Sequence, residues 1–163
     1  MTHKISVTAN RKGLNNPTLA AKLRKAVKTA LQCEGVTQPC EVNIMLTDDA
    51  GIHEINLAMR QVDRPTDVLS FPLNELTPGA FDPALCERDM DTGALMLGDM
   101  MICVPRCEEQ GQEFGHGYER EIMYLTVHSV LHLLGYDHVD EGEQKKAMRE
   151  REKVILKGVG YIS

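Results

Sequence analysis

Three of the six histidines lie in one short stretch and are the side chains best placed to do chemistry. The stretch reads His128-Ser-Val-Leu-His132-Leu-Leu-Gly135-Tyr-Asp-His138. Residues four apart share one face of a helix, so His128 and His132 can present their imidazoles together. Gly135 favours the end of that helix, because glycine enters the left-handed conformation at little cost. The reversed chain can then bring His138 back toward the other two.

Three converging imidazoles predict a metal site rather than ordinary core histidines held by backbone groups. Zinc bound by three protein ligands keeps a fourth position for water or substrate, which is typical of catalytic sites. We therefore expect one Zn²⁺ ion bound by His128, His132 and His138, although nickel or copper would also bind three neutral imidazoles. The second ring nitrogen of each ligand needs a carboxylate or carbonyl partner, and Asp137 is a candidate.

The helix that carries the histidines is predicted over residues 118–134. Its apolar side chains recur at helical spacing and indicate a central, mostly buried helix. The histidines share a different face with Glu121 and Leu125. The stripe consists of Met123, Val127, Val130, Leu131 and Leu134, with Ile122 and Leu133 beside it.

Four further helices and four strands are expected around this helix. Alternating residues predict strands over 4–9 and 42–46, a short strand over 68–71 and a buried strand over 95–104 that is interrupted at Gly98-Asp99. Pro72 makes 68–71 an edge strand or a strand end, since proline cannot donate to a ladder. Caps and breakers predict helices from Pro17 to Gly35, from Thr47 to Arg60, over 105–114 and over 140–157.

This order indicates a small α/β or α+β layered structure. We expect the α+β class, with a mixed β-sheet of about four strands packed against about five helices. The helix over 47–60 should point Ile52, Ile55 and Met59 inward. Residues 74–93 form an irregular insertion, which is expected to be a flap or a surface loop.

Composition restricts the function classes. The 163 residues, 42 % of them hydrophobic, suit one domain over 1–163. No apolar run is long enough to span a membrane, no signal-peptide core is present, and five cysteines without framework spacing favour reduced thiols, so we expect a cytoplasmic protein. A net charge of −6 argues against a general nucleic-acid coat, but it permits a locally basic groove. The basic residues of 17–35 are expected to be a solvated face.

The residue after the first histidine helps to separate the possible reactions. Zinc proteases place a glutamate there as general base, whereas this chain has Ser129, whose hydroxyl cannot serve as that base at neutral pH. Phosphodiester cleavage requires a metal, a positioned nucleophile and a cation for the developing charge. Arg60 or Arg64 is the candidate cation.

Three motifs together resemble the bacterial YbeY family of ribosomal-RNA maturation factors. They are the histidine motif, Pro65-Thr-Asp67-Val-Leu-Ser-Phe71-Pro72, and Leu97-Gly98-Asp99, and the resemblance extends over essentially the whole chain. It implies a zinc-dependent endoribonuclease, a hydrolase that acts on single-stranded RNA in 3′-end processing of small-subunit ribosomal RNA and in ribosome quality control. By matching position, the three histidines would bind the metal and Arg60 would be the functional arginine.

The resemblance also implies partners and leaves alternatives. The implied partners are ribosomal RNA, the small ribosomal subunit, an assembly GTPase and a small-subunit ribosomal protein. The family usually has glycine where this chain has Ser129, and the sequence leaves open whether this serine crowds a metal-bound water or forms a hydrogen bond with it. A metallopeptidase of related architecture and a non-catalytic assembly factor with a structural metal are the alternative functions. Asp67 and Asp99 are interpreted as caps or turn residues.

Overall fold

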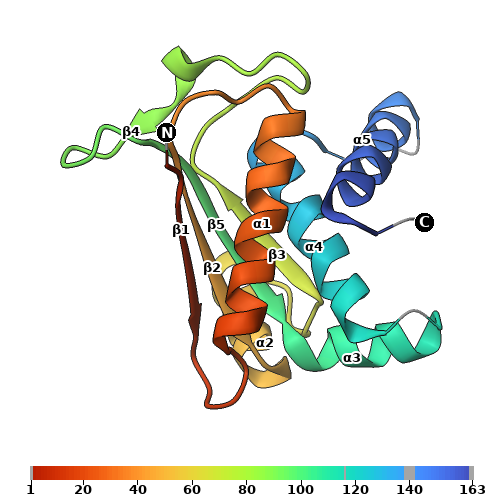
Figure 1. Ribbon diagram of the computed structural model, residues 1–163. Coiled ribbons are helices and arrows are strands. Elements are labelled where there is room, and N and C mark those ends of the chain that lie inside the picture. Colours follow the sequence, from red (N-terminus) through yellow and green to blue (C-terminus); the bar gives the residue numbers. More distant parts are fainter. Residues whose placement is uncertain (1, 116, 138–141, 162–163) are drawn as a thin grey trace.

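The computed structural model describes residues 2–115, 117–137 and 142–161, and it confirms the α+β class. Within these residues a mixed sheet of five strands packs with five α-helices and one 3₁₀ turn at Pro83–Leu85 (Figure 1). The helices are α1 (Pro17–Cys33), α2 (Asp49–Arg60), α3 (Val104–Glu113), α4 (Tyr118–Leu133) and α5 (Glu143–Val159). None of the described helices is long and apolar enough to cross a membrane.

The sheet has the order β1-β2-β5-β3, from strands β1 (Lys4–Ala9), β2 (Cys40–Thr47), β5 (Leu95–Cys103) and β3 (Val68–Pro72). β1 and β2 pair in parallel, as do β2 and β5, whereas β3 pairs antiparallel with β5. The two-residue strand β4 (Glu87–Arg88) also pairs with β5. The prediction of an edge strand that ends at Pro72 is confirmed.

Side chains of local residues determine where the first two helices begin. The Asn16 side chain accepts a hydrogen bond from the backbone N–H of Leu19 at 2.9 Å, which caps α1 before Pro17. The Asp48 side chain accepts one from the N–H of Gly51 at 2.9 Å and caps α2. Both caps agree with the prediction. The predicted start of the last helix at Asp140 lies outside the described residues.

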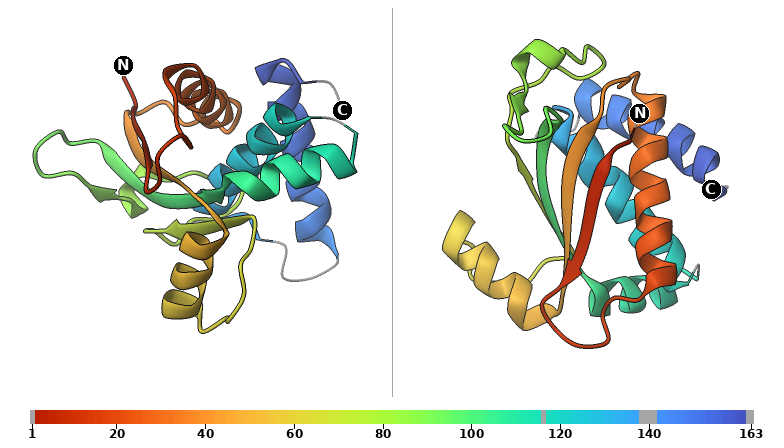
Figure 2. Two further views of the ribbon diagram at one scale, coloured as in Figure 1. Left: turned by 90° about the horizontal axis from the view of Figure 1, so that it is seen from below. Right: turned by 60° about the vertical axis from the view of Figure 1, so that its left-hand side comes forward.

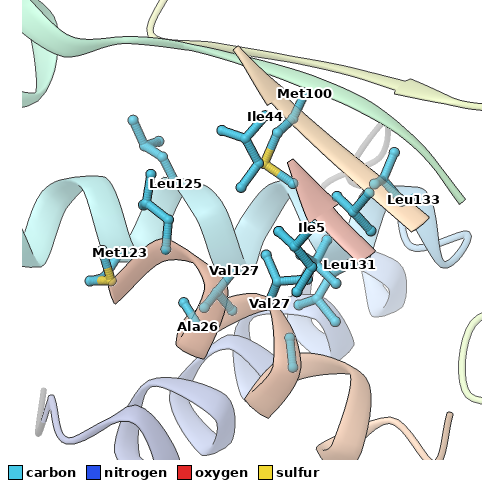
Figure 3. Packing of buried hydrophobic residues seen from close by; sticks show 14 of the residues in the cluster. Ile5, Ala26, Val27, Ile44, Met100, Met123, Leu125, Val127, Leu131 and Leu133 are labelled. Carbon is cyan, nitrogen blue, oxygen red and sulfur yellow. The ribbon is translucent and has the colours of Figure 1, made fainter. Parts of the chain in front are cut away.

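The hydrophobic core lies between one face of the sheet and helices α1, α4 and α5. Ile5, Ile44 and Met100 point from three strands toward Val27 of α1 and Leu131 of α4 (Figure 3). Most of α4 is buried, as its two apolar strips predict. Burial of such aliphatic side chains contributes about 1.5–3 kcal/mol each to folding. The core therefore fixes the position of α4, the helix that carries His128 and His132.

The other face of the sheet carries α2 alone among the helices, and here one packing prediction is partly wrong. Ile52 is fully buried against Leu69 and Cys103, and Ile55 packs against this cluster as a half-buried side chain. Met59, however, is 62 % exposed. The reason is that α2 extends away from the sheet toward its C-terminal end (Figure 2), and Leu57 in the same part of the helix is exposed as well.

The predicted interruption of the 95–104 strand is also wrong, because β5 continues through Gly98. The pairing with β2 instead shifts register between Glu41 and Val42, which leaves one extra residue on β5. Gly98 adopts a φ of +139°, and a Cβ there would lie 2.3 Å from the Phe71 carbonyl oxygen. Glycine thus permits a bulge within a continuous strand.

Residues 74–93 are irregular, as expected, but they are attached to the sheet. The Asn74 side chain donates to the Met96 carbonyl at 2.9 Å and accepts from the Glu87 N–H at 2.9 Å. This one amide therefore connects the start of the insertion to both β4 and β5.

Candidate active site

His128 and His132 lie on one face of α4 with their rings in contact. The two Nε2 atoms are 3.1 Å apart, and the ring centroids are 4.6 Å apart at an interplanar angle of 82°. Both rings are half-buried and line the same cavity. The structure thus brings together two of the three predicted metal ligands, whereas His138 lies outside the described residues.

The opposite nitrogen of each ring has a defined partner. His132 Nδ1 is 2.9 Å from the Tyr136 carbonyl oxygen, which can only accept, so this nitrogen carries a proton. His128 Nδ1 is 3.1 Å from Oε2 of Glu152, a buried carboxylate on α5. When both rings are neutral and carry their proton on Nδ1, each Nε2 atom keeps a lone pair, and the two lone pairs point toward the same place.

This arrangement fits a metal ion. Two imidazole nitrogens bound tetrahedrally to one zinc at about 2.0–2.1 Å would be roughly 3.3 Å apart, close to the observed 3.1 Å. Carbonyl and carboxylate partners on the second ring nitrogen are also typical of metal-binding histidines. The part of the chain that is described contains no set of three histidine, cysteine or carboxylate side chains gathered for a metal, so the third ligand stays a prediction.

Tyr136 supports His132 through both its backbone and its side chain. The preceding Gly135 has a φ of +103°, and a Cβ there would lie 2.2 Å from the Leu76 carbonyl oxygen, so only glycine fits. The Tyr136 hydroxyl donates to Oε1 of Glu34 at 2.5 Å, and Arg151 Nε donates to Oε2 of Glu34 at 2.7 Å. Burial and the Glu34 carboxylate raise the pKa of Tyr136 to about 12.

Helix α5 therefore holds both histidines, one directly through Glu152 and one indirectly through Arg151. Sequence reasoning missed Glu152 and proposed Asp137, which lines the cavity. A signal was present: Glu152 is a single carboxylate in line with the apolar residues Met148, Ile155 and Val159 of α5. The Tyr124 hydroxyl is hydrogen-bonded to the same carboxylate, and burial and this charge raise the pKa of Tyr124.

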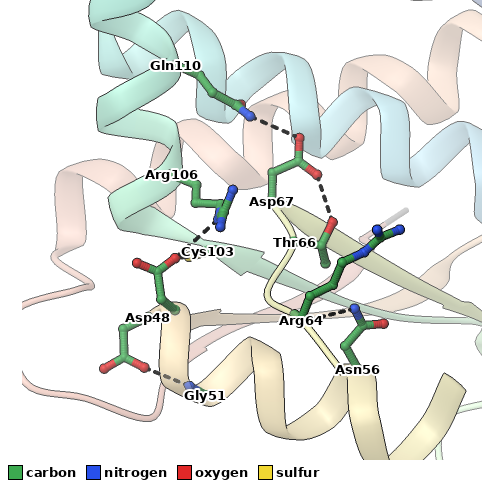
Figure 4. A network of polar contacts seen from close by, with 10 residues as sticks. Asp48, Gly51, Asn56, Arg64, Thr66, Asp67, Cys103, Arg106 and Gln110 are labelled. Carbon is green, nitrogen blue, oxygen red and sulfur yellow. Dashed lines mark hydrogen bonds and ion pairs between the residues drawn. The ribbon is translucent and has the colours of Figure 1, made fainter. Parts of the chain in front are cut away.

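The cavity beside the histidines has a volume of about 680 Å³. Its walls come from β3, from the segments around Asn74 and Tyr136, and from Arg60 at the end of α2. Arg60 is exposed and its Nη1 lies 3.5 Å from the Asn56 side-chain oxygen, while Asn56 also donates to the Arg64 carbonyl at 2.9 Å (Figure 4). Of the two candidate cations, Arg60 lines the cavity, whereas Arg64 is not part of its described wall.

The edge of β3 that faces this cavity is available to an extended chain. Asp67 and Leu73 direct backbone groups to β5, since Cys103 N–H donates to the Asp67 carbonyl at 2.9 Å and Leu73 N–H to the Leu97 carbonyl at 3.1 Å. By alternation, the amide groups of Val68 and Ser70 point away from β5. Both residues line the cavity.

Ser129 connects this strand to the histidine helix. Its hydroxyl is fully buried and forms a hydrogen bond with the Ser70 hydroxyl at 2.6 Å. The family that the sequence resembles usually has glycine at this position, so the side chain of Ser129 adds a hydrogen bond that joins α4 to β3.

The two aspartates of the recognised motifs have different positions. The Asp67 carboxylate accepts from the Thr66 hydroxyl at 3.4 Å and from Gln110 at 3.5 Å, at the entry to β3 (Figure 4). Asp99 lies inside β5 and accepts from the Asn43 side chain at 2.8 Å, so its interpretation as a cap or turn residue is wrong.

Comparisons with known proteins agree with this geometry. A family model described as Endoribonuclease YbeY matches residues 4–160. Proteins named Endoribonuclease YbeY from Acetivibrio thermocellus and Clostridium kluyveri are 44 % and 46 % identical, covering 84 % and 83 % of this chain and 84 % and 88 % of their own. The solution structure of TM1509 from Thermotoga maritima matches with a TM-score of 0.62 at 30 % identity, over 95 % of this chain and 88 % of that one. The chain therefore belongs to the YbeY endoribonuclease family.

Proposed function

We propose that this protein is a metal-dependent endoribonuclease specific for single-stranded RNA. The observation that carries the proposal is the pair of histidines whose Nδ1 atoms are held by Glu152 and Tyr136, so that both Nε2 atoms face one point in a cavity. Family membership supports the nuclease activity. The accessible β3 edge supports single-strand specificity, because an extended strand can reach its amide groups.

The residues have distinct roles in this proposal. His128, His132 and His138 would hold zinc, which supplies a water of lowered pKa and polarises the phosphodiester bond. Glu152 and Tyr136 keep the first two rings in the tautomer that a metal requires. Arg60 lies across the same cavity, where its guanidinium would stabilise negative charge that develops on the phosphate.

The structure favours this reading over a metallopeptidase. Ser129 stands at the position of the protease glutamate, and its buried hydroxyl forms a hydrogen bond with the Ser70 hydroxyl. No general base is therefore present at that position, whereas phosphodiester cleavage can use the 2′-hydroxyl of RNA as the nucleophile.

The deciding experiment measures cleavage of a labelled single-stranded RNA by the intact protein and by His132→Ala. His53→Ala is the matched control, because His53 lies on α2, where it contacts Asp63 at 2.7 Å. We expect the His132 variant and a chelator to abolish cleavage, and the control to retain it. Cleavage that survives both treatments would refute the proposal. Zinc binding and RNA binding without any turnover would instead establish a non-catalytic assembly factor with a structural metal.

The cellular role extends the proposal to 3′-end maturation of small-subunit ribosomal RNA and ribosome quality control in the cytoplasm. It includes the small ribosomal subunit, an assembly GTPase and a small-subunit ribosomal protein as partners. Cells that rely on the His132→Ala protein should accumulate small-subunit RNA with extended 3′ ends. Normal 3′ ends in those cells would contradict this role.

A further inference from the structure

Helix α5 is basic although the chain as a whole is acidic. It carries six lysine and arginine residues and three glutamates, whereas the net charge of the chain is −6. Arg151 and Glu152 face the protein interior, where they bond to Glu34 and His128. Lys146, Arg149, Lys153 and Lys157 are instead exposed on the outer side of the helix.

Four of these cations follow one face of the helix. Lys146, Arg149 and Lys153 recur at intervals of three and four residues, and Lys145 precedes Arg149 by four, which places all four along one side of an α-helix. Lys146, Arg149 and Lys153 are exposed and Lys145 is half-buried. Lys146 and Lys153 are two turns apart, or roughly 10 Å along the axis.

Two surface hollows that share Lys145 and Arg149 place this row beside His128. A hollow of about 220 Å³ is lined by His128 together with Tyr124, Lys145 and Arg149. A second hollow, of about 240 Å³, is lined by Lys145, Lys146, Arg149 and Lys153. His128 also lines the main cavity, so the basic side of α5 lies beside the candidate active site.

We infer that the phosphate backbone of a bound RNA strand leaves the active-site cavity along this row of α5. The inference rests on the proposed function for the identity of the ligand. A polyanion is favoured because the row gives several cations at helical intervals beside a concave surface. One acidic side chain, Glu150, also lines the second hollow.

Helix α1 supplies a matched control surface. Its Lys25 and Lys28 are exposed and line a separate hollow, which shares no described residue with the active-site cavity. Lys25→Ala/Lys28→Ala and Lys146→Ala/Lys153→Ala remove the same charge from exposed helical positions. Alanine is a good helix former, so both variants should remain folded.

The experiment measures binding of a labelled single-stranded RNA of about 12 nucleotides by fluorescence anisotropy at several salt concentrations. A chelator prevents metal-dependent cleavage. Each phosphate contact with a single strand contributes about 0.7 to the slope of log K against log salt, so the α5 variant should lose about 1.4. At 0.1 M salt this corresponds to about 25-fold weaker binding.

The result expected is a reduced slope for the α5 variant and an unchanged slope for the α1 variant. Equal slopes for all three proteins, equal losses in both variants, or no measurable RNA binding would overturn the inference. RNA cleavage is measured separately. If the protein cleaves RNA but the salt slope of the α5 variant is unaltered, only the proposed route along α5 is refuted. If the α5 variant alone has a reduced slope but the unaltered protein does not cleave RNA, only the proposed nuclease activity is refuted.

Discussion

Replacing Glu152 by glutamine is expected to weaken zinc binding without unfolding the protein. The Glu152 carboxylate is 4 % exposed and accepts from His128 Nδ1 at 3.1 Å. Glutamine has the same shape and can still accept this bond through its amide oxygen, but it loses the charge that strengthens the bond and makes the ligand more basic. Loss of such a partner typically costs 10–100-fold in metal affinity, or about 1.4–2.7 kcal/mol.

The assay is competition for zinc between the protein and a colorimetric chelator at neutral pH. Glu150→Gln is the matched control, because it removes the same charge from an exposed position on the same helix. Thermal unfolding of the metal-free proteins tests whether the fold is retained. Equal zinc affinity for Glu152→Gln and the unaltered protein, or equal weakening by Glu150→Gln, would refute the assignment of Glu152 as a positioning residue.

Three further predictions concern stability and thiol chemistry. A double-mutant cycle with Ser70→Ala and Ser129→Ala should give a coupling energy of about 1 kcal/mol in denaturant unfolding, and additive losses would show that the hydroxyl pair is not formed. The hydrogen bond from the Tyr161 hydroxyl lowers the pKa of Glu119 in the folded protein. The stability that this carboxylate contributes is therefore present above its unfolded-state pKa of 4.5, and it is lost as the pH falls through the lower folded-state pKa. Glu119→Gln should therefore lower stability at pH 7 and reduce its decline in acid, which pH-dependent melting measures; an unchanged decline would contradict this. Burial raises the pKa of Cys103 to about 12, so this thiol should resist a disulfide reagent at pH 8 until the protein unfolds, and labelling of the native protein followed by peptide mapping would reveal any earlier reaction.

The sequence was most informative where local rules operate. The spacing of His128 and His132, the Asn16 cap and the position of Pro72 each depend on neighbours within a few residues, and the structure agrees with all three. Apolar periodicity predicted the buried helix α4 for the same reason. Such features can be predicted because a helix or strand end is determined by its own residues.

Features that depend on contacts between distant segments were missed. Glu152 reaches His128 across 24 positions, and Arg151 reaches Glu34 across 117, so no local pattern identifies either pair. The exposure of Met59 likewise depends on how far the sheet extends beneath α2, which periodicity does not report. The sequence predicts a strand break at Gly98 where the structure has a bulge, because both features have the same glycine signal.

The support of both histidines by α5 has a consequence for the order of events during synthesis. The histidine helix leaves the ribosome before Arg151 and Glu152 do, and domains generally begin to fold from the N-terminal side during translation. A nascent chain that ends before α5 can pack its strands and α1 while His128 still lacks Glu152, and while Glu34, which holds the Tyr136 hydroxyl, still lacks Arg151. The proposed metal site would thus be among the last parts of the molecule to become ordered, and a chain truncated before α5 would lack the Glu152 partner of His128.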